Sequence, residues 1–469
     1  MVNLAFTVFL LVAPAVFGAV TLEYRTDQIL LQPKAGMSRA PLTAFHAALG
    51  AAVKNTFAAI GGIQVITVPA GETVPGIIAK YQQSGLVEFA EPDYIGHIYG
   101  TTPNDPRYLD GTLWGLNQID APEGWDVLTS ASNIVVAVLD TGVRYTHEDL
   151  ASNMWVNAND GSHGWNTITQ TNNPMDDNGN GTLVAGVLGA VGNNGKGVTG
   201  VAWKVQIMAC KCFNNFGQGS VSDAVACMVY ARTNGARIIN ASWGFTNSLT
   251  LSNAVASLRD AGIIVAAACG NTAADVDLAP TYPASYALDN AVTVASVTRS
   301  NTLAANSNYG ATNVDLAAPG EGIYSTFAAT DSYYYSQSGT SFAAPYVTGA
   351  LALMLAKYPA ENYQQIIQRL LQATDPLPSL AGKCVTGGRL NLKKALNPPI
   401  WLASVTTANA GTFQLRLSTG ANRTCVLQAS TNLTGWTSIY TNITSANGTF
   451  DFTNTLGSPR QFFRAVATP

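Results

Sequence analysis

The chain has 469 residues, of which 47% are hydrophobic and only 11% charged, with 24 Lys and Arg against 28 Asp and Glu. So much apolar sequence with a net charge of −4 can bury large cores, which excludes intrinsic disorder. No basic run could neutralise several phosphates, so we expect no nucleic acid among the partners.

The amino-terminal segment is almost wholly apolar over residues 5–17. This run is shorter than the roughly 20 residues that a spanning helix needs. It predicts a signal peptide over residues 1–18, with a membrane anchor as the alternative. No later segment reaches spanning length without polar residues, so we expect a secreted or extracytoplasmic protein without stable membrane insertion.

Residues 21–98 combine strand-like and helix-like stretches, which predicts a small α+β domain. The expected strands are 28–31 and 63–68, and the expected helices are 42–50 and 73–84. A segment rich in Pro, Gly and Thr, residues 100–106, follows as an expected exposed and cleavable linker.

From residue 133 the pattern changes to short continuous apolar runs that alternate with helix-length segments. The runs are 134–139, 205–209, 237–242, 263–268 and 291–297, and the helical segments include 221–233 and 249–261. Strands buried on both faces are typical of a parallel sheet covered by helices. The fold class is therefore predicted as α/β, a three-layer domain with a mainly parallel sheet over residues 104–397.

The last seventy or so residues contain Thr, Asn and Ser between short alternating runs at 412–417, 449–453 and 461–466. This composition predicts a small β-sandwich over residues 399–469. Within it, Trp436 and Tyr440 are candidates for contact with a surface or polysaccharide, or for packing in the core.

Six cysteines in a chain this long do not make a dense disulfide framework. We favour buried thiols over bridges for most of them, and the pairing of any bridges cannot be deduced from the sequence.

Three polar residues follow apolar runs or open a helix in the predicted sheet domain. Asp140 ends the first run, Asn271 follows the run 263–268, and Ser341 begins a long apolar stretch of helical length. Carboxyl ends of strands and amino ends of helices are where such folds build their sites. The alternatives are an Asp that caps a turn and a Ser that caps a helix.

Four segments, VLDTGV, AACGN, VDLAAPG and GTSFAAP, resemble the subtilisin-like serine peptidases (subtilases) in order and spacing. The resemblance extends over about residues 104–397, and the segment that closes at 87–94 resembles the inhibitory propeptide of that family. It implies a serine endopeptidase whose partners are an extended polypeptide and its own propeptide. No cofactor is required for that chemistry.

The resemblance also assigns roles to residues of this chain. Asp140 would orient a histidine, Ser341 would be the nucleophile, and Asn271 would stabilise the oxyanion. The residues expected to pair with the main chain of a bound peptide are Gly217, Gly219, Ser242, Trp243 and Gly244.

The sequence departs from the family at the general base. The family motif reads D-x-x-G-H-G-T-H-V-A-G, and residues 176–186 read D-D-N-G-N-G-T-L-V-A-G, so Asn180 stands in the histidine position. An amide neither accepts a proton near neutral pH nor becomes a cation that Asp140 could stabilise. We therefore expect severely impaired catalysis; the alternative is a pseudopeptidase that binds peptides or acts as a scaffold.

The chain has four histidines that could substitute as the base. His147 and His163 lie in segments that resemble family loops, and His46 lies in the expected propeptide helix. His97 precedes the linker and could serve as a borrowed base for one self-cleavage, although a solvent-exposed linker histidine is the plainer interpretation.

Structural calcium is common in subtilases, and residues 176–178 are rich in oxygen atoms. Turn-forming polar residues are the alternative, and no ligands are assigned.

Overall fold

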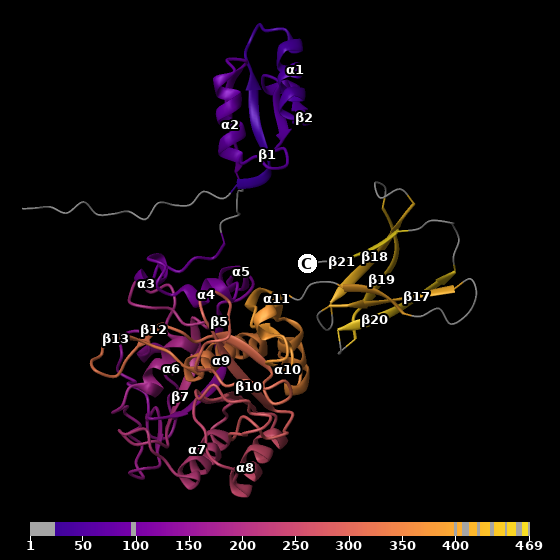
Figure 1. Ribbon diagram of the computed structural model, residues 1–469. Helices are drawn as coiled ribbons and strands as arrows, with labels where there is room; N and C mark the ends of the chain where they lie inside the picture. The colour runs from indigo at the N-terminus through magenta and orange to yellow at the C-terminus, as the bar shows by residue number, and fades with distance from the viewer. Residues whose placement is uncertain are drawn as a thin grey trace, which may run out of the picture. The chain divides into compact units, whose positions relative to one another are not determined.

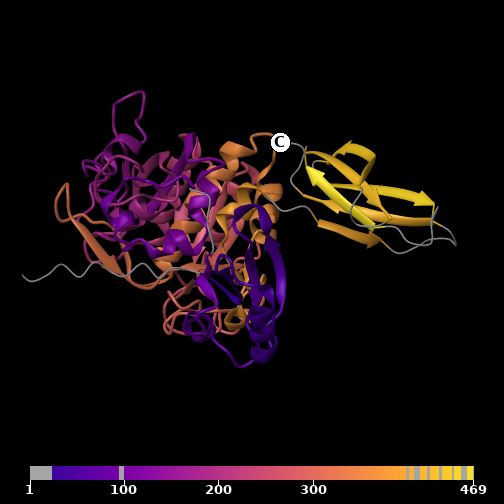
Figure 2. The same ribbon diagram turned by 90° about the horizontal axis from the view of Figure 1, so that it is seen from above.

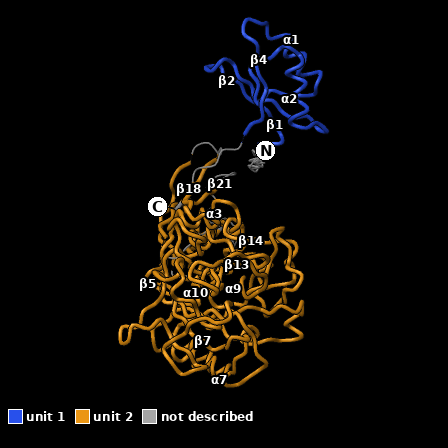
Figure 3. Tube along the Cα trace, turned by 90° about the vertical axis from the view of Figure 1, so that its left-hand side faces the viewer, with its two compact units in different colours: residues 1–99 blue, residues 100–469 orange. Residues whose placement is uncertain are grey.

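The computed structural model describes residues 24–94, 100–397, 401–405, 412–419, 423–431, 436–445, 448–455 and 462–467. The chain divides into two compact units, Met1–Tyr99 and Gly100–Pro469 (Figure 3). The expected signal peptide and His97 lie outside the described residues. Of the described helices, none has the length and apolar character needed to traverse a bilayer.

The first unit is a βαββαβ domain. Its elements are β1 (Tyr24–Pro33), α1 (Arg39–Leu49), β2 (Val53–Phe57), β3 (Ile63–Thr67), α2 (Val74–Gln83) and β4 (Val87–Tyr94). The sheet has the order β2-β3-β1-β4 with antiparallel neighbours. Leu42 of α1 and Ile77 of α2 share one core with Ile29 and Ile66 of the sheet. The predicted α+β domain is confirmed.

The second unit contains a nine-stranded sheet with the order β14-β15-β11-β10-β9-β8-β5-β7-β6. Its strands are β5 (Ser130–Asp140), β6 (Gly164–Asn166), β7 (Lys204–Lys211), β8 (Ile238–Ala241), β9 (Ile264–Ala268), β10 (Ala291–Val297), β11 (Leu316–Pro319), β14 (Asp375–Pro376) and β15 (Gly388–Arg389). Neighbouring strands run parallel except β14 and β15. The five apolar runs expected as strands are β5, β7, β8, β9 and β10.

Helices cover both faces of this sheet (Figures 1 and 2). Val136 and Val138 of β5 share a core with residues of α6 (Asn180–Gly189) and α9 (Thr340–Lys357). Ala137 and Leu139, which point the other way along the same strand, share a second core with residues of α7 (Val221–Thr233) and α8 (Leu249–Asp260). Successive side chains of one strand thus face two different cores, one on each side of the sheet, which establishes the predicted three layers.

Shorter elements complete this domain. The helices are α3 (Pro106–Leu109), α4 (Trp114–Gln118), α5 (Ala121–Trp125), α10 (Tyr363–Gln372) and α11 (Leu392–Leu396). A separate hairpin, β12 (Ile323–Thr326) and β13 (Tyr334–Gln337), has no counterpart among the predicted elements. Its second strand is only partly buried, so its sequence lacks the continuous apolar run by which the other strands were found.

The segment 100–106, which was expected to be an exposed linker, is partly buried in the structure. Asp105 is fully buried, and its carboxylate accepts hydrogen bonds from the backbone N–H groups of Asn193 (2.6 Å) and Asn194 (3.5 Å). Burial raises the pKa of Asp105 to about 6. The second half of this segment therefore belongs to the packed domain.

The carboxy-terminal strands form two sheets, ordered β16-β17-β20 and β19-β18-β21. They are β16 (Trp401–Val405), β17 (Thr412–Ser418), β18 (Thr424–Ser430), β19 (Thr437–Ile443), β20 (Thr449–Thr455) and β21 (Phe462–Ala467). Leu417 and Phe452 of one sheet share a core with Cys425 and Leu427 of the other, which confirms the β-sandwich.

Two aromatic residues and the cysteines have defined environments. The Tyr440 ring lies 5.1 Å from that of Phe452, so this side chain joins the packing of the sandwich. The Arg464 guanidinium lies 4.4 Å from the ring centre of Trp436. All six cysteines are free and buried, namely Cys210, Cys212, Cys227, Cys269, Cys384 and Cys425.

Candidate active site

Asp140 is the last residue of β5, at the carboxyl edge of the parallel sheet, and is only 2% exposed. Its Oδ1 atom accepts a hydrogen bond from the backbone N–H of Thr141 (2.7 Å). Burial raises the pKa of Asp140 to about 7, and the charge of Asp176 adds to this, against the opposing hydrogen bonds from Asn180 and Thr141. The carboxyl group is thus poised between its two protonation states near neutral pH.

Asn180 is the first residue of α6, and its side chain meets Asp140. Its Nδ2 atom donates to both Asp140 oxygens, at 2.9 Å each. Gly181 makes this approach possible, because a Cβ atom there would overlap the backbone oxygen of Gly142. The structure therefore brings together two residues that the sequence placed in one site.

Asp176 fixes the amino end of α6 and hence the position of Asn180. Its carboxylate accepts hydrogen bonds from the backbone N–H groups of Gly179 and Thr182, at 2.9 Å each, and from the Thr182 hydroxyl at 2.6 Å. Carboxylates stabilise helix amino ends by satisfying free N–H groups and by their charge.

Ser341 lies in the first turn of α9 and makes reciprocal contacts with Ser242, which follows β8. The Ser341 hydroxyl donates to the backbone oxygen of Ser242 (3.0 Å), and the Ser242 hydroxyl donates to the backbone oxygen of Ser341 (2.8 Å). Within the described ranges, the Ser341 hydroxyl makes no hydrogen bond to Asn180 or to a histidine. At rest its proton therefore points to a backbone carbonyl, which is no general base.

Asn271 lies in the loop after β9, beside the first turn of α9. Its Oδ1 atom accepts hydrogen bonds from the backbone N–H (2.8 Å) and the hydroxyl (3.0 Å) of Thr340. A backbone N–H can only donate, so the atom that faces Thr340 is the oxygen, and Nδ2 is left as a donor. An amide held in this way next to Ser341 can offer a hydrogen bond to a developing oxyanion.

The two segments expected to pair with a peptide are held to the residues already described. The Trp243 indole N–H donates to the backbone oxygen of Leu139 (2.7 Å), which ties residues 242–244 to β5. The other segment, which contains Gly217 and Gly219, is held at Asn215, whose backbone oxygen accepts a hydrogen bond from the Asn178 side-chain amide (3.0 Å). Pairing with the main chain of a bound peptide stays a prediction for Gly217, Gly219, Ser242, Trp243 and Gly244.

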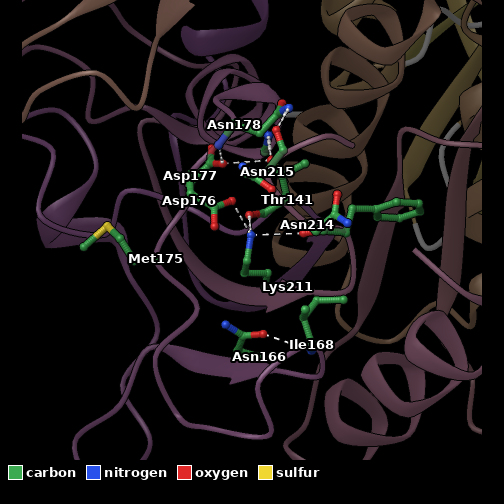
Figure 4. Close-up of polar contacts among 12 residues, drawn as sticks. Thr141, Asn166, Ile168, Met175, Asp176, Asp177, Asn178, Lys211, Asn214 and Asn215 are labelled. Carbon is green, nitrogen blue, oxygen red and sulfur yellow. Dashed lines mark hydrogen bonds and ion pairs between the residues drawn. The ribbon is translucent and has the colours of Figure 1, made fainter. Parts of the chain in front are cut away.

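Lys211 joins three parts of the site, and sequence reasoning missed it. Its Nζ atom donates to the backbone oxygens of Thr141 (2.6 Å) and Phe213 (3.0 Å) and to Asp177 Oδ1 (2.6 Å). Figure 4 shows Lys211 beside Thr141 and Asp177. The Lys211 side chain is only 4% exposed. A Lys directly after four apolar residues, Ile207 to Cys210, was the available signal, because a buried ammonium group needs partners.

The oxygen-rich segment 176–178 is occupied by hydrogen-bond donors. Besides the α6 contacts, Asp176 accepts the Thr141 hydroxyl (2.9 Å) and the backbone N–H of Asn178 (3.0 Å), while Asp177 pairs with Lys211. In the part of the chain that the structure describes, no group of three or more His, Cys, Asp or Glu side chains could hold a metal ion. Structural calcium stays a prediction without assigned ligands.

The three described histidines are bonded elsewhere. His147 is fully buried, with Nε2 3.0 Å from the Tyr333 backbone oxygen and Nδ1 accepting the Asp149 N–H at 3.2 Å. His163 Nδ1 donates to the Trp155 backbone oxygen (3.0 Å). His46 lies in α1 of the first unit, with Nδ1 2.7 Å from the Tyr81 hydroxyl.

The comparisons with known proteins agree with this architecture. A family model described as the subtilase family matches residues 131–405. The chain belongs to the subtilase family. A second model, the fervidolysin N-terminal prodomain, matches residues 12–93, so this subtilase carries a prodomain before its sheet domain.

The relatives of this subtilase include a protein named as a serine proteinase. The chain is 36% identical over 324 residues to the thermophilic serine proteinase of Bacillus sp. (strain AK1), and the matched region covers 69% of this chain and 76% of the relative. It is also 36% identical over 296 residues to thermitase of Thermoactinomyces vulgaris, covering 63% of this chain and 99% of thermitase. Among solved structures, a protease from Pseudoalteromonas arctica matches 63% of this chain and 99% of its own, with 30% identity and a TM-score of 0.55. The predicted family and prodomain are thereby confirmed.

Proposed function

We propose that this protein is an exported subtilase whose hydrolysis of peptide bonds is severely impaired, because Asn180 stands where the family has its general-base histidine. Ser341 would be the nucleophile of an acyl transfer, Asn271 an oxyanion donor and Asp140 the buried carboxyl group. The Asn180–Asp140 contact is the observation that carries this proposal.

The impairment follows from where the Ser341 proton can go. When Ser341 Oγ attacks a carbonyl carbon, the hydroxyl proton must pass to a base. Its hydrogen-bond acceptor at rest is the Ser242 backbone oxygen, and the Asn180 amide cannot take up a proton near neutral pH. Asn180 also uses its Nδ2 atom on Asp140, so the carboxylate is engaged without a histidine between it and the nucleophile.

Other parts of the site support acyl transfer. Ser341 lies in the first turn of α9, an 18-residue helix, where backbone N–H groups and the helix dipole favour negative charge. Asn271 is held with its Nδ2 atom free to donate toward the same region. Such preorganised donors accelerate acyl transfer even when no base is present.

A peptide-binding pseudopeptidase is the second candidate. The resting site favours it, because the Ser341 hydroxyl and the Asn180 amide each already have a partner, and because Lys211 and Trp243 fix the two expected peptide-pairing segments. Isothermal titration calorimetry of the unaltered protein with an extended peptide tests it. Measurable affinity is expected, and no heat of binding at saturating peptide contradicts this candidate.

The impaired-enzyme proposal is tested by comparing the unaltered protein with Ser341→Ala on fluorescently labelled casein. In subtilisin, a relative of this chain, loss of either the His or the Ser leaves about the same residual activity, roughly 10³ to 10⁴ over water. The two proteins should therefore differ by less than about tenfold. A difference of a thousandfold or more would show that Ser341 has a working base after all.

Export is part of the proposal and rests on the apolar residues 5–17. Amino-terminal sequencing of protein recovered from the culture medium should place the first residue near position 19. Intact residues 1–18 on protein retained in the cells would contradict export.

A further inference from the structure

A buried chain of polar side chains runs behind the nucleophile, from the middle of α9 to its first turn. Thr348 and Asn240 are fully buried, and the Thr348 hydroxyl donates to Asn240 Oδ1 (2.8 Å). Asn240 Nδ2 in turn donates to the Ser242 hydroxyl (2.9 Å), which donates to the backbone oxygen of Ser341 (2.8 Å). Each member of the chain donates to the next one.

The far end of this chain meets a need that the helix itself creates. In an α-helix the backbone oxygen of residue 341 would accept from the N–H of residue 345. That residue is Pro345, which has no N–H to donate. The Ser242 hydroxyl therefore supplies the donor that the helix lacks at Ser341.

The direction of the chain is decided by Thr348. The Ser242 hydroxyl has one proton, which goes to Ser341 only while Asn240 presents its NH₂ group to Ser242. If the Asn240 amide were reversed, its oxygen would face Ser242 and compete for that proton. The Thr348 hydroxyl has two acceptors within reach, Asn240 Oδ1 at 2.8 Å and the Ala344 backbone oxygen at 3.1 Å. By donating to the nearer one, Asn240 Oδ1, it holds the amide in the orientation that leaves the Ser242 proton for Ser341.

We propose that Thr348 is a positioning residue for Ser341, acting through Asn240 and Ser242. The same helical turn carries the Ser341 hydroxyl and the Ser341 N–H, so loosening its backbone oxygen shifts the nucleophile and an oxyanion donor together. This inference rests on the proposed role of Ser341 in acyl transfer. Small displacements of reacting groups lower turnover while leaving substrate affinity largely intact.

The kinetic test uses the full chain with Asn180→His, which should give measurable turnover. Thr348→Val keeps the shape and removes the donor, and is expected to lower kcat about fivefold, the factor typical of one neutral hydrogen bond, with KM changed less than twofold. Thr348→Ser keeps a hydroxyl and should restore kcat. Thr348→Ala is the second donor-free variant if Val does not fold.

The matched control is Thr293→Val, which removes a buried hydroxyl that donates to the backbone oxygen of Ala284 (2.6 Å) outside the chain described above. Its kcat should match the parent. The inference is overturned if Thr348→Val leaves kcat unchanged, if it acts on KM alone, or if Thr293→Val lowers kcat equally.

A second readout does not depend on catalysis. In crystal structures of the full chain with native Asn180, Thr348→Val should lengthen the distance between Ser242 Oγ and the Ser341 backbone oxygen beyond hydrogen-bond range, while Thr348→Ser keeps it. An unchanged distance in the Val variant overturns the inference. If the distance changes as expected but Asn180→His has no activity, the positioning role holds and the proposed function fails.

Discussion

Restoring a histidine at position 180 is the most direct test of the proposed mechanism. Asn180 begins α6 with its side chain against both Asp140 oxygens, so an imidazole at this position has a buried carboxylate to receive its Nδ1–H. The neighbouring Gly181 and the Asp176 contacts that set the start of the helix do not depend on the Asn180 side chain.

The expected gain follows from two opposing effects. In subtilisin, a relative of this chain, the histidine is worth about 10⁶ in turnover, or roughly 8 kcal/mol. Against this, the Ser341 hydroxyl must leave the Ser242 backbone oxygen to reach the new base, which costs about 1 kcal/mol, or roughly fivefold. We therefore expect Asn180→His to raise kcat/KM by about 10⁵.

The assay is hydrolysis of a chromogenic peptide anilide and of labelled casein by four proteins purified in parallel. These are the unaltered chain, Asn180→His, Ser341→Ala and the Asn180→His, Ser341→Ala double variant. Activity in Asn180→His that disappears in the double variant is expected. If the activity of Asn180→His stays at that of the double variant, the lack of a histidine at position 180 is not what limits catalysis at this site.

Three further predictions concern the surroundings of the site. Burial raises the pKa of Asp140 from 3.8 to about 7, so its contribution to stability is complete below pH 4 and is lost as the pH rises through 7. The Asp140→Asn variant lacks this titration. Between pH 4 and pH 8 its free energy of unfolding in urea should therefore fall by about 4 kcal/mol less than that of the unaltered chain. His163→Gln should leave the activity of the Asn180→His protein within twofold, because its ring is bonded to Trp155, and a large loss would reopen His163 as a base. Lys211→Met should lower the free energy of unfolding by about 2 kcal/mol, since a buried charged donor to two buried backbone oxygens and to the exposed Asp177 carboxylate is lost. An unchanged melting curve would show that Lys211 does not stabilise these segments.

Much of the architecture could be read from local patterns in the sequence. The apolar runs that became β5, β7, β8, β9 and β10 are continuous because those strands are buried on both faces. The hairpin β12–β13 and the buried half of the segment 100–106 were not foreseen. Both are held by contacts with distant parts of the chain, which local composition does not record.

The candidate site divides in the same way. The sequence by itself determined that Asp140 ends a strand, that Ser341 starts a helix and that position 180 holds an amide in place of an imidazole, because each depends on residue type and near neighbours. Only the tertiary structure decided that Asn180 meets Asp140 across 40 residues and that Ser341 exchanges hydrogen bonds with Ser242 across 99. Those contacts exist because parallel strands bring their carboxyl ends to one edge, and the order of strands in the sheet is a property of the whole fold.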